Sequence, residues 1–286
     1  MKKNWSEVIR SKKTGVSINL KELFDYRDLI FLFVKRDFVS IYKQTLLGPL
    51  WYIIQPLLTT LTFTFVFGTI AKMKVSDDVP HMLFYMAGIV PWQYFSSSLN
   101  RTSQTFIANA GIFGKVYFPR LTVPISVVIS NLFAFGIQFF LLVCFIVYYH
   151  VTEDKYTFSF NTGLLFIPIL ILIMAIQGLG LGIIISSLTT KYRDLTFLVS
   201  FGLQLFMYAT PIIYPLSDLS KAPEIIQKAI YYNPMTGIIE GFKSALLTCE
   251  TPDLYLISYS LIISIFFLFI GITIFNKTER TFMDTI

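Results

Sequence analysis

The N-terminal part of the chain carries an amphipathic pattern. Between residues 20 and 41, apolar side chains recur at steps of three or four residues, with one turn skipped at Arg27, and charged side chains fall between them. This spacing predicts a helix. Because the polar side is densely charged, we expect this helix to lie in the membrane interface rather than to cross the bilayer. Residues 1–19 are polar and basic, and we expect them to form a flexible tail.

Long apolar stretches follow, and each approaches the length of about 20 residues that crosses a bilayer. The pattern predicts an all-α membrane protein with six transmembrane helices, in a transmembrane domain over 46–276 that follows the tail and interface helix of 1–45 and precedes a cytoplasmic tail at 277–286. Gly88 and Pro91 fall inside the second stretch, where we expect the helix to be interrupted. The expected spans are about 46–71, 82–108, 121–149, 164–188, 195–214 and 254–275.

The segment between the fifth and sixth stretches has two shorter apolar patterns. Asn233 precedes Pro234, which favours a helix start because a capping side chain is followed by proline at the first helical position. One apolar face precedes this point and another follows it. Such stretches are too short to span a membrane. The sequence therefore predicts two short re-entrant helices within about 223–247, before the last span.

Composition agrees with a membrane protein. Hydrophobic residues make up 55% of the 286 residues and charged residues 14%, whereas soluble domains have about 25% charged residues. The mean hydropathy is +0.66. A net charge of +6 could indicate nucleic-acid binding. We instead expect no nucleic-acid partner, because ten of the 23 Lys and Arg residues fall in the first 43 positions, beside the first span.

The distribution of Lys and Arg predicts the orientation of the chain. If the N-terminus is inside, the inner segments hold 16 of these residues and the outer segments hold 6. Basic residues favour the cytoplasmic side, so we expect both termini in the cytoplasm and the chain in the cytoplasmic membrane. Arg101 is counted in neither group because it lies within the second stretch, near its inner end. There it can anchor the helix at the interface or contact a lipid-linked anionic substrate.

Several kinds of catalytic motif are missing from the sequence. The nearest approach to a phosphate-binding loop is "GIFGKV" (111–116), which lacks the required spacing and has Val116 where a hydroxyl would bind magnesium. We therefore expect that the chain does not hydrolyse ATP by itself. The sequence shows no zinc motif and no serine–histidine arrangement. It also places no acidic residue near the middle of a span, where ion-coupled transporters usually need one.

The predicted inner loops are short, charged and aromatic, as in "FGKVYFPR" (113–120) and "TKYRDL" (190–195). They could anchor the chain at the membrane or dock another protein. Three stretches, "KRDFVSIYKQTLLGPLWYIIQPLL", "KVYFPRLTVP" and "YYNPMTGIIEGFKSAL", resemble the permease subunit of ABC-2 type polysaccharide exporters, which move O-antigen, teichoic acid and capsular polymers. The resemblance covers nearly the whole chain.

This resemblance implies a homodimer that binds two copies of a separate ABC ATPase subunit and exports a lipid-linked polysaccharide. It implies no cofactor in this chain, since ATP and Mg would be bound by the partner subunit. On this basis the short basic loops are docking elements for the ATPase. The residues that we assign to ATPase docking are Arg36, Asp37, Tyr42, Lys43, Lys115, Tyr117, Tyr192, Arg193 and Asp194.

A polysaccharide cargo would need an aromatic path and a site for its lipid diphosphate. Aromatic residues make up 17% of the chain. Most of them are also explained by interfacial belts and lipid contact. We expect Tyr52, Tyr208 and Tyr214 to line the pore, because a buried tyrosine hydroxyl needs a polar partner. Arg27, Lys35 and Arg101 are candidates for lipid-diphosphate binding.

Two other functions fit parts of the sequence. An ABC-2 exporter of a lipid or small molecule would share the fold but carry a different cargo. A membrane enzyme acting on polyprenyl substrates would need acidic residues at a membrane face, for which Asp77 and Asp78, or Glu153 and Asp154, are the candidates. Neither acidic pair has supporting histidines, so the enzyme is the less favoured of the two.

Overall fold

The computed structural model describes residues 20–43, 47–73, 75, 79–153 and 156–285, with positions 20, 40–43, 221 and 280–285 described by backbone alone. These residues form helices and turns, without a strand among them. Four described helices are long and apolar enough to cross a membrane: Gly48–Ile70, Thr122–Thr152, Thr162–Thr189 and Leu254–Glu279. The expected all-α membrane fold is confirmed, and the count of six spans remains a prediction.

The α-helices differ widely in length, and short 3₁₀ or π segments extend several of them. The α-helices are α1 (Leu20–Asp25), α2 (Arg27–Lys43), α3 (Trp51–Phe63), α4 (His81–Ser103), α5 (Thr105–Phe113), α6 (Thr122–Thr152), α7 (Ile167–Thr189), α8 (Leu195–Tyr208), α9 (Glu224–Tyr231), α10 (Thr236–Lys243) and α11 (Leu254–Thr285). The other segments are η1 (Gly48–Leu50), η2 (Thr64–Ile70), η3 (Thr162–Phe166), η4 (Leu216–Lys221) and η5 (Ser244–Thr248).

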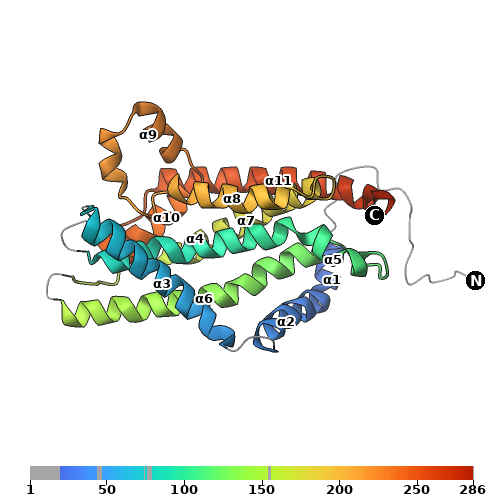
Figure 1. Cartoon of the computed structure of the whole chain (residues 1–286), viewed down its shortest axis with the longest axis horizontal. Helices are drawn as coiled ribbons and strands as arrows, with labels where there is room; N and C mark the ends of the chain where they lie inside the picture. Colours follow the sequence, from blue (N-terminus) through green and yellow to red (C-terminus); the bar gives the residue numbers. More distant parts are fainter. Residues whose placement is uncertain (1–19, 44–46, 74, 76–78, 154–155, 286) are drawn as a thin grey trace, which may run out of the picture.

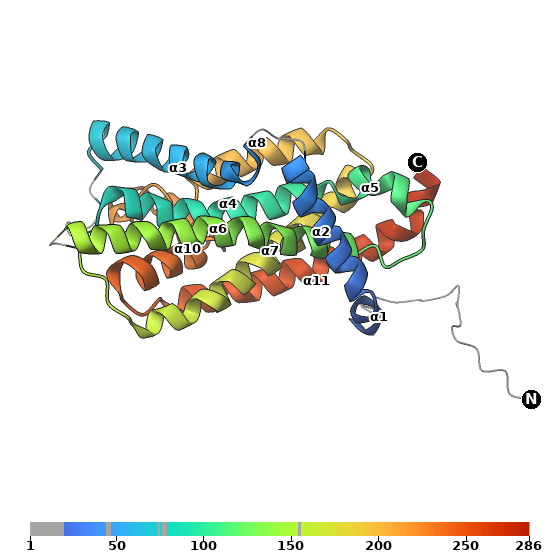
Figure 2. The same cartoon turned by 90° about the horizontal axis from the view of Figure 1, so that it is seen from below.

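The longer helices form an elongated bundle. Helices α4, α6, α7, α8 and α11 run side by side along the long axis of the molecule (Figures 1 and 2). Helix α4 packs against α3, α6, α7 and α10, and α7 packs against α11. Both views place α5 and the C-terminal end of α11 at one end of the bundle, which we call the α5 end, and α10 at the other, which we call the α10 end. Figure 1 shows α9 toward the α10 end as well.

Helix α4 is the buried centre of the bundle. Every residue from Leu83 to Trp92 is buried, as expected for a helix that is apolar on all sides. The expected interruption at Gly88 and Pro91 is wrong, because α4 continues through both residues and ends at Ser103. Neighbouring helices allow proline inside a membrane helix by supporting the backbone around it. A Cβ atom at Gly88 would lie 3.0 Å from the Ile212 side chain, so the helix is tightly packed around Gly88.

Other helices also differ from the sequence pattern. The amphipathic stretch that the sequence predicts over 20–41 is divided at Tyr26 into α1 and α2. Helix α8 ends at Tyr208, before the expected end of the fifth span at 214, and the following turn buries Ile212 and Ile213. Within the predicted re-entrant segment the structure forms two short helices, α9 and α10. Helix α9 projects away from the bundle (Figure 1).

Helices α7 and α11 approach each other closely. A Cβ atom at Gly180 would lie 2.7 Å from the backbone nitrogen of Leu268, and one at Gly271 would lie 2.7 Å from the carbonyl oxygen of Gly180. Both distances are too short for a side chain, so only glycine fits here. Small residues let membrane helices pack backbone to backbone, and this pair is therefore packed through glycine contacts.

Candidate functional site

Helix α2 lies obliquely across the bundle near its α5 end (Figure 2). Its apolar side faces inward: Phe33 and Val34 are buried. The Phe33 ring packs against Phe118 with centroids 5.8 Å apart, and the Phe38 ring packs against Phe133 at the same separation. Aromatic pairs at this distance stabilise contacts between elements. The amphipathic helix is therefore held against α6 and the turn before it.

A buried carboxylate ties α2 to the centre of the bundle. Asp37 is 7% exposed. Its Oδ1 accepts hydrogen bonds from Arg36 at 3.1 and 2.9 Å, and its Oδ2 accepts one from Arg101 Nη2 on α4 at 3.0 Å. Arg101 Nη1 also donates to Asn131 Oδ1 on α6 at 3.2 Å, and Asn131 Nδ2 donates to Ser98 Oγ at 3.2 Å. We call these five residues the Asp37 cluster, and they join α2, α4 and α6.

The Asp37 cluster changes the roles expected for its members. Asp37 was expected to face an ATPase subunit, but it is buried and both of its carboxylate oxygens are bonded within the chain. Arg101 was expected to anchor α4 or to contact a lipid diphosphate. Its side chain is 39% exposed and pairs with Asp37, so it also connects two helices. Arg36, with 42% of its side chain exposed, remains open to a partner.

The turn between α5 and α6, which we call the basic turn, carries two cations, Lys115 and Arg120, in different environments. Lys115 is exposed, and the Tyr117 side chain is 74% exposed. The Arg120 guanidinium instead lies 5.4 Å from the centre of the Phe113 ring and donates to the carbonyl of Glu279 on α11 at 2.8 Å. The turn is thus held from inside by Arg120, while the side chains of Lys115 and Tyr117 are exposed at its surface.

Residues 191–194, in the turn between α7 and α8, are exposed. Tyr192, Arg193 and Asp194 all face outward, and the Lys191 ammonium lies 5.3 Å from the centre of the Tyr192 ring. Because α6 begins and α7 ends at the α5 end of the bundle, this turn and the basic turn lie at the same end of the molecule (Figure 1). The structure thus brings these predicted docking segments together with α2.

The remaining candidate residues of this region lie on α2, some with described side chains and some without. Arg27 and Lys35 are exposed on α2, and Arg27 also lies 5.0 Å from the centre of the Phe24 ring. The predictions for Tyr42 and Lys43 fall on side chains outside the described part of the chain.

The acidic pairs considered for an enzyme are likewise only partly described. Asp77, Asp78 and Asp154 lie outside the described residues, whereas Glu153 is exposed after α6. Among the described residues, no group of three or more His, Cys, Asp or Glu side chains could hold a metal ion.

Two of the three predicted pore tyrosines are neighbours. The Tyr214 hydroxyl donates to the carbonyl oxygen of Tyr208 at 3.2 Å. The side chain of Tyr208 itself is 55% exposed at the end of α8. Tyr52 is half-buried on the first turn of α3. The hydroxyl of Tyr214 thus has the polar partner that was expected, and that partner belongs to the backbone.

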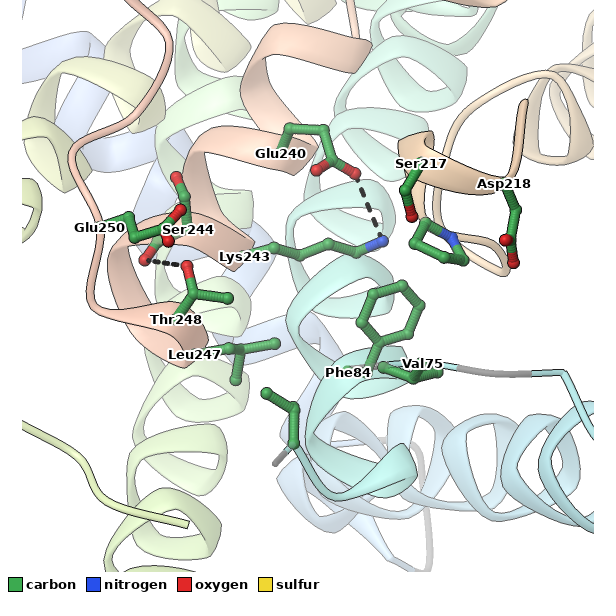
Figure 3. A pocket seen from close by; sticks show the side chains of 12 residues that line it. Val75, Phe84, Ser217, Asp218, Glu240, Lys243, Ser244, Leu247, Thr248 and Glu250 are labelled. Atoms are coloured by element: carbon green, nitrogen blue, oxygen red, sulfur yellow. Dashed lines mark hydrogen bonds and ion pairs between the residues drawn. The ribbon is translucent and has the colours of Figure 1, made fainter. Parts of the chain in front are cut away.

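Sequence reasoning missed a second buried charged pair, at the α10 end. Lys243, which falls within the predicted re-entrant segment and was counted among the cations of the outer segments, is 4% exposed. Its ammonium lies 3.6 Å from the centre of the Phe84 ring, donates a short hydrogen bond to the carbonyl of Pro211, and is 3.6 Å from Glu240 Oε1 (Figure 3). This arrangement links α10 to α4 and to the turn after α8.

A local signal could have revealed this pair. Lys243 lies four residues after Ile239 and three before Leu246, and both are buried, so the spacing already places the lysine on the apolar side of the helix. Helix α10 has eight residues, too few to span a membrane, and Lys243 and Glu240 face each other on it. Burial lowers the pKa of Lys243 to about 8 against the attraction of Glu240, and burial raises the pKa of Glu240.

Known proteins resemble this chain over nearly its full length. The O-antigen export system permease protein RfbA of Klebsiella pneumoniae is 32% identical over 270 residues, which is 94% of this chain and 99% of that protein. RfbA of Myxococcus xanthus is 26% identical over 269 residues, 93% of this chain and 98% of that protein. The polysialic acid transport protein KpsM of Escherichia coli is 22% identical over 242 residues, 84% of this chain and 89% of that protein.

The sequence pattern that defines ABC-2 type transporters matches residues 28–247. That range includes most of α2, the buried helix α4, both exposed turns at the α5 end, and α10 with Glu240 and Lys243. The described helices include four of membrane-spanning length. This chain is a multi-pass membrane protein, and it belongs to the ABC-2 type transporter family.

Proposed function

We propose that this chain is the permease subunit of an ABC transporter that exports a lipid-linked polysaccharide across the cytoplasmic membrane. The observation that carries the proposal is the near full-length similarity to RfbA, at 32% identity over 94% of this chain. KpsM, which is named for the transport of another polysaccharide, also matches most of the chain. The cargo is then an O-antigen-like or teichoic-acid-like glycan. A lipid or small-molecule exporter of the same family is the alternative that the experiment below separates.

The energy for export comes from a separate ATPase subunit in this proposal. Two copies of that subunit bind ATP and Mg and dock on a homodimer of this chain. The α5 end faces the cytoplasm, as the excess of Lys and Arg on the expected inner segments suggests. The exposed side chains of Arg36, Lys115, Tyr117, Tyr192 and Arg193 support docking there. Asp194, Tyr42 and Lys43 belong to the same proposed surface.

The Asp37 cluster suggests how motion in the ATPase reaches the spans. A partner that binds Arg36 and the exposed side of α2 acts on a helix whose buried carboxylate is bonded to Arg101 on α4. Arg101 is in turn bonded to Asn131 on α6. Displacement of α2 would therefore pull on two long helices through charged hydrogen bonds, which are stronger than neutral ones.

The lipid-linked end of the cargo needs cations at the cytoplasmic interface. Arg27 and Lys35 are exposed on α2 and supply two positive charges for a diphosphate. Arg101 is less suited to this role alone, because it is already paired with Asp37. The sugar chain then passes Tyr208 and Tyr214, whose rings offer flat apolar faces to sugar C–H groups, while Tyr52 contributes from α3.

Deletion of the gene tests the proposed function. We expect a lipid-linked glycan to accumulate inside the cell and to disappear from the cell surface, and a plasmid copy of the gene to restore surface display. Extraction of lipid-linked glycans and surface labelling with a lectin measure both outcomes. If the deletion strain displayed its glycans normally and instead accumulated a lipid or small molecule, the alternative cargo would be correct.

A further inference from the structure

Helix α4 is mostly apolar up to Trp92 and mostly polar after it. With 23 residues it has the length of a span, yet it is not among the four described helices that are apolar enough to cross a membrane. From Gln93 to Ser103 the chain reads QYFSSSLNRTS. Helix α4 nevertheless runs beside α6 and α7, which belong to two of those four spans (Figures 1 and 2). The polar half of α4 therefore lies at membrane depth.

Four polar residues of this half share one side of α4 and are partly exposed. They follow one another at steps that make residues neighbours on a helix surface, three or four positions apart. We call them the polar seam: Gln93, Ser96, Ser97 and Asn100.

Neighbouring helices occupy the other sides of α4 at this level. The Trp92 ring packs against Phe206 of α8 with centroids 5.6 Å apart. The Tyr94 hydroxyl donates to the carbonyl oxygen of Val128 on α6 at 3.3 Å. Helix α4 also packs against α7. The polar seam is the side that these contacts leave open.

Lipid cannot satisfy the polar seam. Hydrocarbon offers no hydrogen bonds, so polar side chains at membrane depth face the bundle interior or a water-filled cavity. Two acceptors of the seam, Gln93 Oε1 and Asn100 Oδ1, are buried and accept no hydrogen bond within the described part of the chain. Buried acceptors without a partner are costly, and a donor from a molecule outside the chain would remove this cost.

The groups of the polar seam match those of a sugar. Amide and hydroxyl side chains both donate and accept hydrogen bonds, and sugar hydroxyls do the same. The Ser96 hydroxyl donates to the carbonyl oxygen of Gln93 at 3.4 Å, so its oxygen can still accept. A row of such groups exchanges hydrogen bonds with successive sugar hydroxyls without holding any one sugar tightly. Contacts of this kind suit a polymer that must move along the helix.

The polar seam lies beside the helix that carries the proposed diphosphate site. Arg101 follows Ser97 by four positions, and its Nη2 donates to Asp37 on α2 at 3.0 Å. Lys35, one of the two cations proposed to bind the diphosphate, lies two residues before Asp37 on the same helix. A diphosphate held on α2 would therefore bring the attached sugars within reach of the seam.

We propose that the polar seam binds the sugar units next to the lipid diphosphate as the glycan enters the permease from the cytoplasm. The inference rests on the proposed function, which supplies the glycan and places the α5 end in the cytoplasm. Gln93 and Asn100 accept hydrogen bonds from sugar hydroxyls, and Ser97 donates or accepts. The seam adds a polar wall to the path for which Tyr208 and Tyr214 are the aromatic candidates.

Reactivity of an introduced cysteine tests whether the polar seam meets water. The full-length chain, together with its ATPase subunit in lipid nanodiscs, carries Ser97→Cys in a background of Cys144→Ser and Cys249→Ser. A negatively charged methanethiosulfonate, which does not enter lipid, measures the reactivity of the cysteine. We expect Ser97→Cys to be labelled.

Phe266→Cys in the same background is a control at similar depth. Gly178 of α7 packs against Ser98 of α4. Gly180, two positions further along α7, packs against Leu268 of α11. Phe266 is 56% exposed on α11, and lipid should keep the charged reagent away from it. We therefore expect Phe266→Cys to stay unlabelled.

Protection by the cargo completes the test. The probe is the lipid-linked glycan that the deletion strain accumulates, extracted and incorporated into the same nanodiscs before ATP is added. We expect it to slow labelling of Ser97→Cys in a concentration-dependent way. Adding Asn100→Leu should raise the amount of glycan needed for half protection about fivefold, the loss expected for one neutral hydrogen bond. Adding Ser258→Leu instead, at an exposed position of α11, should leave that amount unchanged.

The inference and the proposed function fail in different ways. If Ser97→Cys stays unlabelled without glycan, then the polar seam is covered, as by a second copy of this chain, and the inference is wrong. If Ser97→Cys is labelled but the accumulated glycan gives no protection, then export stands and the sugars pass elsewhere. If the deletion strain accumulates no glycan, then the proposed function is wrong and the inference falls with it.

Discussion

The two ends of the bundle bury charge in different ways. At the α5 end, Asp37 pairs with an arginine that is 64 positions away in the sequence, and the Asp37 cluster joins three helices. At the α10 end, Glu240 and Lys243 are three positions apart on a single helix. The Asp37 carboxylate accepts hydrogen bonds on both oxygens, whereas Glu240 Oε1 faces the Lys243 ammonium at 3.6 Å. The long-range pair connects separate helices, and the local pair lies within one short helix whose lysine also reaches the turn after α8.

Removal of Asp37 should have the largest effect. Asp37→Ala removes the hydrogen bonds that Arg36 and Arg101 donate to this carboxylate, and together these charged hydrogen bonds contribute about 3 kcal/mol. We expect a lower unfolding temperature in detergent and loss of export. Asp28→Ala removes an acid from the same helix whose side chain is 91% exposed, and it should change neither. Normal stability and export in Asp37→Ala would show that the Asp37 cluster does not connect the helices.

The pair at the α10 end should be the next most sensitive. Lys243→Met leaves the Pro211 carbonyl without its donor and Glu240 without its cation, and we expect a loss of about 2 kcal/mol. The double variant Lys243→Met with Glu240→Gln should recover most of it, because a buried pair can be replaced as a unit. Lys228→Met breaks an exposed pair with Glu224 that has similar spacing, and it should cost at most about 0.5 kcal/mol. Unfolding of the four proteins, followed by intrinsic fluorescence, would measure the differences.

The exposed turn at the α5 end should affect partner binding without affecting stability. Reversal of charge by Arg193→Glu and Asp194→Arg is expected to weaken capture of the ATPase subunit about tenfold, since charge complementarity governs such contacts. Glu153→Arg is the matched control, because Glu153 is an exposed residue that follows α6 at the other end of the bundle from this turn. Capture is measured by a pull-down with the purified ATPase. If capture by the reversed variant equalled that by the unaltered chain, this turn would not belong to the docking surface.

The smallest effect is expected for the tyrosines. Tyr208→Ala together with Tyr214→Ala should slow export a few-fold while the complex with the ATPase stays intact, because each stacking contact contributes only about 1 kcal/mol. Tyr208→Phe with Tyr214→Phe keeps the rings and should export at nearly the normal rate. Export is followed by the appearance of surface glycan over time. An unaltered rate in the alanine variant would place the sugar path elsewhere.

Local patterns in the sequence predicted much of the fold. The periodicity around Phe33 and Phe38 indicated a helix with one apolar side, and these residues do pack against the bundle. The exposed positions of Lys115 and Tyr192 also agree with their place in short polar turns. Such features depend on neighbours within a few residues, which is the range over which hydrophobic spacing is informative.

Other features depend on contacts that no local pattern contains. Nothing near Asp37 or near Arg101 in the sequence indicates that these residues meet, because their contact depends on how α2 crosses the bundle. Pro91 was read as a helix break, whereas the packing around α4 supports a continuous helix. The burial of Lys243 could have been anticipated from its spacing, but a cavity beside it needs η4 and the start of α4 to come together.

The glycine contacts between α7 and α11 set a limit on how the bundle can rearrange. The backbones at Gly180 and Gly271 are so close that no side chain fits between the two helices, so we expect α7 and α11 to move as one unit. Any widening of a passage must occur where helices meet through side chains alone. A larger residue at either position would push α7 and α11 apart and alter the packing of the bundle before any step of transport begins.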